Sequence, residues 1–244
     1  MKKILVGIAM IILLAIACNA PAGSQVGSLV GGASPTEAGP GASPTQALVQ
    51  PAGATAIQPP AGSQGAPVIT ETDPCKLLSA EKAALILGET PNVVPAEGGG
   101  ISTCMFLTQK ANKSILISFT SANVAKANFI SEILQYQKGC SVSYSGGTST
   151  ATPLPPEGQA LLSKSLPELF VMDLQLQAPC GGKSSPLPEY GSYAYSMETP
   201  VFPAVSVVIA TEERLFTFTY AETGGDPAKL VENARAVAKA ALGK

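Results

Sequence analysis

The sequence has no histidine in any of its 244 positions. Imidazole is the usual general base of serine and cysteine hydrolases and the commonest nitrogen ligand of zinc. Its absence excludes Ser-His-Asp and Cys-His catalysis, histidine-bound zinc and imidazole proton relays. An enzyme of this composition would have to use carboxylates, as glycoside hydrolases do. The acidic candidates are scattered along the chain, at Glu157, Glu168, Asp173, Glu189, Glu198, Glu212 and Glu213.

Charge of either sign is scarce. Charged residues make up 13 % of the chain, against about a quarter in an average protein. Without Lys2 and Lys3 of the first segment, 13 basic residues remain against 17 acidic ones, a net charge of −4. The basic residues form no block, and only Arg214 and Arg235 are arginines. Binding to a phosphate backbone needs clustered positive charge, so the composition argues against a nucleic-acid partner.

The chain also lacks an apolar run that reaches the 20 residues or so needed to span a bilayer. Ile4 to Ala17 is apolar for 14 residues and follows the basic start Lys2-Lys3. This is the pattern of a secretory signal. The run ends at Ala17-Cys18 and is similar to the bacterial lipoprotein signal, whose cysteine is lipidated. Ala15 stands where leucine is usual, and an ordinary signal peptide with an incidental cysteine is the alternative.

We therefore expect residues 1–17 to be a signal peptide and residues 18–72 to carry the lipid on Cys18 and form a stalk. Between residues 19 and 72, Glu37 and Glu71 are the only charges and no residue is aromatic. The segment is rich in Gly, Pro, Ala, Ser and Thr. Such a composition cannot bury enough apolar surface to offset chain entropy, so it predicts disorder.

Residues 73–244 carry the patterns of a globular α+β domain. Ser79 and Gly88 are typical helix caps around Ala80 to Leu87, and Asp226-Pro227 begins a helix that Gly243 ends. Alternating apolar residues predict strands, and spacings of three and four predict a further helix. The expected order is helix, two strands, helix, irregular insert, three strands, helix. Short turns between clustered strands favour an antiparallel sheet with helices packed on it.

Five cysteines are present, and four remain once Cys18 is assigned to lipid. In an oxidising compartment an even number predicts disulfides. Three pairings exist, and we favour Cys75–Cys104, which would clip the first helix to a strand, with Cys140–Cys180, which would close the insert. A metal site is the alternative, but the chain has neither a Cys-x-x-Cys pair nor histidine. We expect no metal and no cofactor.

The insert at residues 139–188 has no clean apolar period, and a helix around Gly158 to Gln175 would be interrupted at Pro167. Long ordered loops on a rigid scaffold often carry binding residues. We therefore expect a binding surface here; an elaboration that only covers the sheet is the alternative. Tyrosine can also stack on ligands, although a core role for Tyr193 and Tyr195 competes with that. The candidate contact residues are Lys164, Glu168, Phe170, Asp173, Lys183 and Tyr190.

The segment Asp73-Pro74-Cys75-Lys76-Leu77-Leu78-Ser79-Ala80-Glu81-Lys82, followed by Cys104-Met105-Phe106, resembles the DUF3558-type bacterial lipoproteins. Tyr190-Gly191-Ser192-Tyr193, two strands and a final helix are also similar to that family's second half. The insert fits the pattern poorly. The resemblance implies a location and a disulfide-stapled α+β fold, and no reaction.

Together these features predict a cell-membrane protein, lipid-anchored at Cys18 and facing outside the cytoplasm. We expect a non-catalytic binding module, not an enzyme. Its partner would be an envelope protein, a wall polymer or a small molecule. The alternatives are a structural envelope protein without a ligand and a histidine-independent enzyme that uses carboxylates.

Overall fold

The computed structural model describes residues 69–110, 112–140, 156–199 and 203–244. The chain divides into two units, Met1–Thr55 and Ala56–Lys244, and every described residue belongs to the second. The expected signal peptide, the expected lipidation site at Cys18 and most of the expected stalk lie outside the described residues. The architecture below is that of the second unit.

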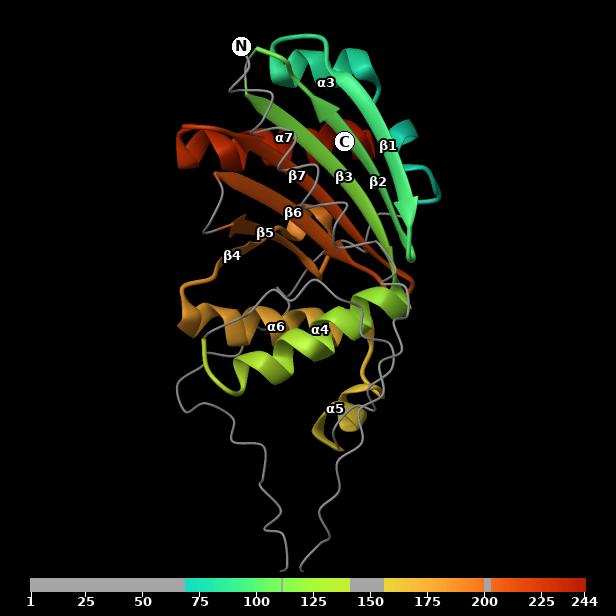
Figure 1. Ribbon diagram of the computed structural model, residues 1–244, viewed down its shortest axis with the longest axis vertical. Coiled ribbons are helices and arrows are strands. Elements are labelled where there is room, and N and C mark those ends of the chain that lie inside the picture. Colours follow the sequence, from blue (N-terminus) through green and yellow to red (C-terminus); the bar gives the residue numbers. More distant parts are fainter. Residues whose placement is uncertain (1–68, 111, 141–155, 200–202) are drawn as a thin grey trace, which may run out of the picture. The chain divides into compact units, whose positions relative to one another are not determined.

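A single antiparallel sheet forms the centre of the unit (Figure 1). Its seven strands lie in the order β1-β2-β3-β7-β6-β5-β4, and every neighbouring pair is antiparallel. The predicted α+β class is therefore confirmed. The strands are β1 (Asn92–Gly98), β2 (Ile101–Leu107), β3 (Lys113–Ser121), β4 (Lys183–Pro186), β5 (Ala194–Thr199), β6 (Ala204–Ala210) and β7 (Arg214–Glu222).

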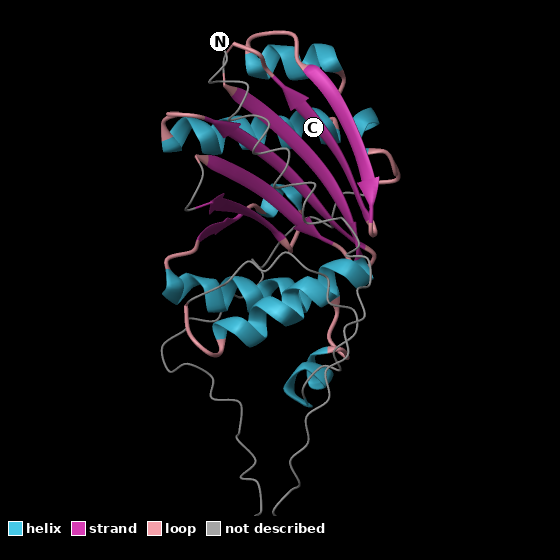
Figure 2. Cartoon of the chain, viewed as in Figure 1, coloured by secondary structure: helices cyan, strands magenta, loops and turns pink. Residues whose placement is uncertain are grey.

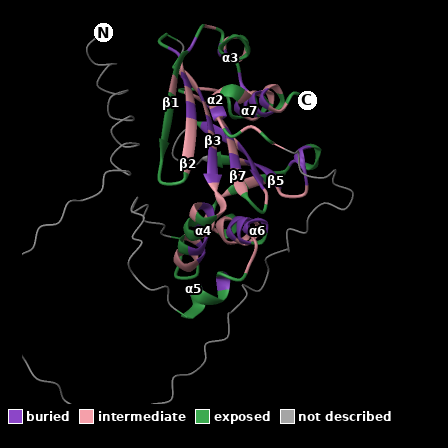
Figure 3. Cartoon of the chain, turned by 90° about the vertical axis from the view of Figure 1, so that its right-hand side faces the viewer, coloured by how far each residue is buried: buried purple, intermediate pink, exposed green. Residues whose placement is uncertain are grey.

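Helices cover the sheet from two sides (Figure 2). On one face, a core of buried residues joins the sheet to α2 (Pro74–Leu77), α3 (Ala80–Leu87) and α7 (Pro227–Leu242). On the other, a second core joins β5, β6 and β7 to α4 (Ala122–Tyr136), α5 (Pro156–Leu161) and α6 (Leu166–Gln177). The described residues also form two short 3-10 helices, η1 (Ala178–Cys180) and η2 (Pro188–Tyr190). Figure 3 shows the buried strand centres between these layers.

Local sequence fixes the ends of the outer helices. The Ser79 hydroxyl accepts a hydrogen bond from the Lys82 amide at 3.3 Å, and Gly88 ends α3 with a φ of 81°. That left-handed conformation is nearly free for glycine and costly for other residues. Asp226 caps α7 by accepting from the Ala228 amide at 3.0 Å. The predicted helices at both ends of the domain are therefore confirmed.

The strand β1 was not predicted, and its position explains why. All its residues except Val94 are exposed, because it lies at the edge of the sheet and pairs with β2 alone. It therefore shows no alternation of apolar and polar residues. Pro95, which cannot donate to a sheet hydrogen bond, sits in its middle, a residue that edge strands tolerate.

The insert is more regular than the sequence indicated. It contains α5, α6, η1 and β4. The helix expected around Gly158 to Gln175 is divided into α5 and α6, and Pro167 is the second residue of α6, where a proline has no hydrogen bond to lose. Leu166, Leu169 and Leu174 of α6 are buried in the second core. The insert therefore supplies part of the hydrophobic core, although its sequence shows no clean apolar period.

Both predicted disulfides are present. Cys75 of α2 is bonded to Cys104 of β2, with Cα atoms 5.0 Å apart. Cys140, just after α4, is bonded to Cys180 of η1, with Cα atoms 5.2 Å apart. The first bond ties the beginning of the domain to the sheet, and the second ties the far ends of α4 and α6 together.

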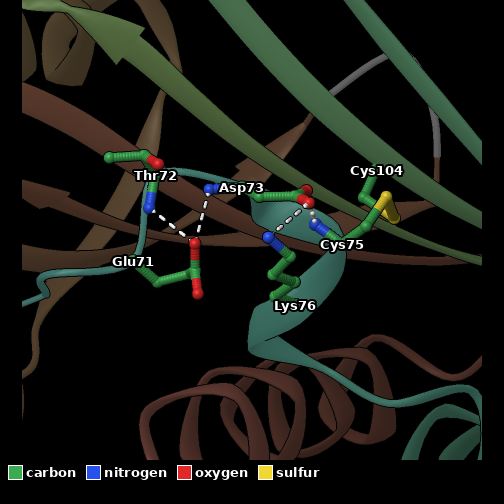
Figure 4. Close-up of polar contacts among 6 residues, drawn as sticks. All are labelled: Glu71, Thr72, Asp73, Cys75, Lys76 and Cys104. Carbon is green, nitrogen blue, oxygen red and sulfur yellow. Dashed lines mark hydrogen bonds and ion pairs between the residues drawn. A yellow bond between two sulfur atoms is a disulfide. The ribbon is translucent and has the colours of Figure 1, made fainter.

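A small polar network holds the chain where the domain begins (Figure 4). The Glu71 carboxylate accepts hydrogen bonds from the amides of Thr72 and Asp73, at 2.9 and 3.0 Å. Asp73 in turn caps α2 by accepting from the Cys75 amide at 2.9 Å, and its other oxygen lies 3.7 Å from the Lys76 ammonium. The network orients Cys75 toward Cys104 at the first turn of the domain.

Candidate functional site

A shallow hollow of about 250 Å³ lies against α6. Its volume is just below the range typical of small-molecule sites, so it has room for a small group or the end of a larger molecule. Val171, Met172 and Tyr193 give it an apolar side. The polar lining residues are Lys164, Glu168 and Gln175. All but Tyr193 come from α6 or the turn before it, so one helix sets the shape of the hollow.

The first turn of α6 fixes the Glu168 side chain. Ser165 and Glu168 form a capping box, in which the Ser165 hydroxyl accepts from the Glu168 amide at 3.3 Å. In return, Glu168 Oε2 accepts from the Ser165 amide at 2.8 Å. These hydrogen bonds, with the attraction of Lys164 and Lys126 as a smaller contribution, hold the pKa of Glu168 below its ordinary value. The carboxylate at this end of the hollow is therefore charged and held by the cap of the helix.

Lys164 and Glu168 were predicted as contact residues, and the structure brings them together. The Lys164 ammonium lies 4.0 Å from Glu168 Oε1, and both side chains are exposed. Such a pair contributes little to stability because water screens it. At 4.0 Å the two groups are too far apart for a direct hydrogen bond, so each can still bond to an incoming molecule. The pair therefore provides a donor and an acceptor side by side.

Phe170 and Tyr190 do not belong to this surface. The Phe170 side chain is 1 % exposed, and its ring packs against Phe129 and Tyr195 in the second core. Tyr190 is 4 % exposed in the core beneath α7, where its hydroxyl donates to the Arg235 carbonyl at 3.3 Å. Neither ring can contact a ligand without unfolding its surroundings. The prediction that these two aromatic residues line a binding surface was wrong.

Asp173 and Lys183 also lie away from the hollow. Lys183 is on the edge strand β4, where its ammonium lies 3.2 Å from the carboxylate of Glu198. Asp173 is 1 % exposed, on the same side of α6 as Leu169, Phe170 and Leu174. Its spacing of four from Leu169 and three from Phe170 places it on the buried stripe. The prediction that Asp173 is a surface contact was therefore wrong.

Asp173 instead faces the half-buried Glu132 of α4, where α4 packs on α6. One Asp173 oxygen accepts from the Gln177 side-chain amide, and the other has no hydrogen-bond partner among the described residues. Burial, and secondarily the charge of Glu132, raises the pKa of Asp173 to about 8. Burial likewise raises the pKa of Glu132. This is a paired-carboxylate arrangement, but Asp173 is 1 % exposed, so a substrate cannot reach both carboxyls and the pair does not support glycoside hydrolysis.

Sequence reasoning overlooked Gln175 and Glu132 as site residues, and it weighed Tyr193 for ligand stacking but favoured a core role. Gln175 had a signal in the sequence, because residues 168, 171, 172 and 175 recur at the spacing of one helix face. Tyr193 reaches the hollow through the fold of the sheet, and Glu132 meets Asp173 only when α4 packs on α6. Pairings of that kind leave no trace in a single sequence.

Among the described residues, no three or more His, Cys, Asp or Glu side chains gather in a group that could hold a metal ion. In the same part of the chain, no helix combines the length and hydrophobicity that crossing a bilayer requires. Comparison with known proteins adds no relative, since no family model, curated protein or solved structure matches this sequence.

Proposed function

We propose that this chain is an exported envelope protein, anchored by lipid at Cys18, whose domain is a non-catalytic binding module of the DUF3558-like kind. The observation that carries the binding role is the hollow on α6. It combines an apolar wall with a donor and an acceptor that remain available, the usual composition of a small-molecule site. The anchor is supported by the apolar run and the Ala17-Cys18 junction.

The support beneath the hollow is rigid. The capping box fixes the first turn of α6, and the bond between Cys140 and Cys180 ties its last turn to the end of α4. A preformed site loses less conformational entropy when it binds than a mobile one does. Helix and disulfide together therefore suit a module that holds one ligand in a fixed pose.

Binding can be tested on full-length protein purified from its own host. Native mass spectrometry is expected to show an added mass on the wild-type protein. Gln175→Trp places a large ring in the hollow and is expected to abolish the added mass. Gln109→Trp makes the same change at an exposed turn between β2 and β3 and should retain it. No added mass on the wild type, or equal retention by Gln175→Trp, would contradict the binding role.

The anchor is tested separately with Cys18→Ala. Without the thiol no diacylglycerol can attach, so the variant is expected to leave the membrane fraction almost completely and to take up no labelled fatty acid. Each buried methylene of an acyl chain contributes about 0.8 kcal/mol to membrane affinity, so loss of two chains is a large effect. A variant that stays membrane-bound at the wild-type level would place the anchor elsewhere.

A further inference from the structure

The contact between α4 and α6 contains an acid pair that packing alone does not require. Asp173 and Glu132 face each other from the two helices in a core otherwise made of apolar side chains. Asp173 is buried and Glu132 half-buried, so the two adjacent carboxylates cannot both be charged without a cost in solvation and repulsion. The pair is therefore stable only while it holds a proton.

Among the described residues neither Glu132 nor Asp173 forms an ion pair. The nearby cations Lys126 and Lys164 act on Glu168, on the outer side of α6. From α6 itself, Gln177 offers one amide hydrogen bond to Asp173.

Of the strands that pack on this core, β5 and β6 bring no cation. β7 packs through Leu215 and carries Arg214, which pairs with Ser121 at the start of α4, about three helical turns before Glu132. β5 contributes Tyr195, whose buried hydroxyl has no hydrogen-bond partner among the described residues. β6 contributes Val208 and Ala210, and η1 contains only Ala178, Pro179 and the bonded Cys180. The state of the acid pair is therefore set by its own proton.

We propose that the Glu132–Asp173 pair is a proton-operated latch that holds α6 against α4 and thereby sets the shape of the hollow. With the proton present, the carboxyls are neutral or share one charge, and the two helices close over the core. Loss of the last proton leaves two facing charges, and the helices separate at the centre of α6 while Cys140–Cys180 holds their ends. The effect of the latch on binding rests on the binding function proposed above, whereas the latch between the two helices does not.

The first test measures stability against pH. Because the folded-state pKa of Asp173 lies above the unfolded value of about 3.9, the folded chain keeps a proton that the unfolded chain has lost. The stabilisation is complete below about pH 4 and disappears as pH rises toward 8. One retained proton raises the unfolding equilibrium constant about tenfold per pH unit in that window. The chain has no histidine to add a slope of its own there.

Urea unfolding of the full chain from pH 5 to 8 should show this slope for the wild type. Asp173→Asn keeps the shape of the neutral acid and is expected to remove most of it. Glu132→Gln removes the charge repulsion on Asp173 and should lessen the dependence of stability on pH. This variant replaces Asp173→Asn in the test if Asp173→Asn does not fold. Glu168→Gln, at an exposed carboxyl of the same helix that can keep its cap, should leave the slope unchanged. A flat wild type, or the wild-type slope in Asp173→Asn, overturns the latch.

The second test measures the opening. Amide exchange, corrected for its intrinsic pH dependence, should increase in α4 and α6 of the wild type between pH 7 and pH 9, while α7 stays protected. Asp173→Asn should show no such increase. If a ligand mass is found, the wild type should lose it at pH 9 and Asp173→Asn should keep it. Equal retention at pH 9 by both proteins would overturn the control of binding, and unchanged exchange in the wild type would overturn the opening.

Discussion

Phe170→Ala is expected to lower the free energy of unfolding by about 3–5 kcal/mol, the usual loss for a large aromatic side chain removed from a core. The ring is 1 % exposed, and its centroid lies 5.6 Å from those of both Phe129 and Tyr195. It thus joins α4 to α6 and the sheet. The free energy of unfolding of most domains is only about 5–15 kcal/mol. The loss would therefore be a large share of the stability.

The effect of Phe170→Ala can be measured by chemical denaturation followed by far-ultraviolet circular dichroism. Leu162→Ala is the control, since Leu162 belongs to the same insert and is 54 % exposed. Its substitution should change the stability by no more than about 0.5 kcal/mol. If Phe170→Ala cost less than about 1 kcal/mol, the insert would be an appendage of the domain instead of part of its core.

Replacing Cys140 and Cys180 together with alanine is expected to cost about 4 kcal/mol. The bond joins residues 40 positions apart, and a cross-link of that span removes about this much entropy from the unfolded chain. Cys140 is exposed and Cys180 half-buried, so the substitutions leave no core cavity. The loss should therefore come from loop closure and not from packing.

The measurement is the same unfolding experiment under non-reducing conditions, with peptide mapping to show that Cys75–Cys104 is still formed. The double substitution leaves the apolar contacts of α6 in place, so the variant is expected to fold and to unfold at a lower denaturant concentration. An unchanged midpoint would mean that the unfolded chain is already compact between the two positions, contrary to the loop-closure argument.

The sequence predicted best the elements whose signals are local. Caps at Ser79, Gly88 and Asp226 mark helix ends through hydrogen bonds to residues two to four positions away. The alternation in β3 and β7 reflects burial of one strand face on α3 and α7. These patterns are physical consequences of short-range geometry, and reading them required no knowledge of the tertiary arrangement.

Elements that depend on distant partners were missed or misread. β1 is defined only by its register with β2 and carries no pattern of its own. In α6 the buried stripe includes Asp173, so the apolar period was broken by an acid whose partner, Glu132, is 41 positions earlier. Of the six predicted contact residues, two line the hollow: Lys164, in the turn before α6, and Glu168, in its first turn.

The two edges of the sheet have a consequence for how this protein behaves at high local concentration. An unpaired edge strand is a template on which another chain can add a strand, and repeated addition leads to fibrils. Here Pro95 interrupts the row of donors along β1, and β4, at the opposite edge, has only four residues, two of them Lys183 and Pro186. The row of backbone hydrogen-bonding groups is therefore interrupted at one edge and very short at the other. Many copies can share a small area without polymerising through their sheets.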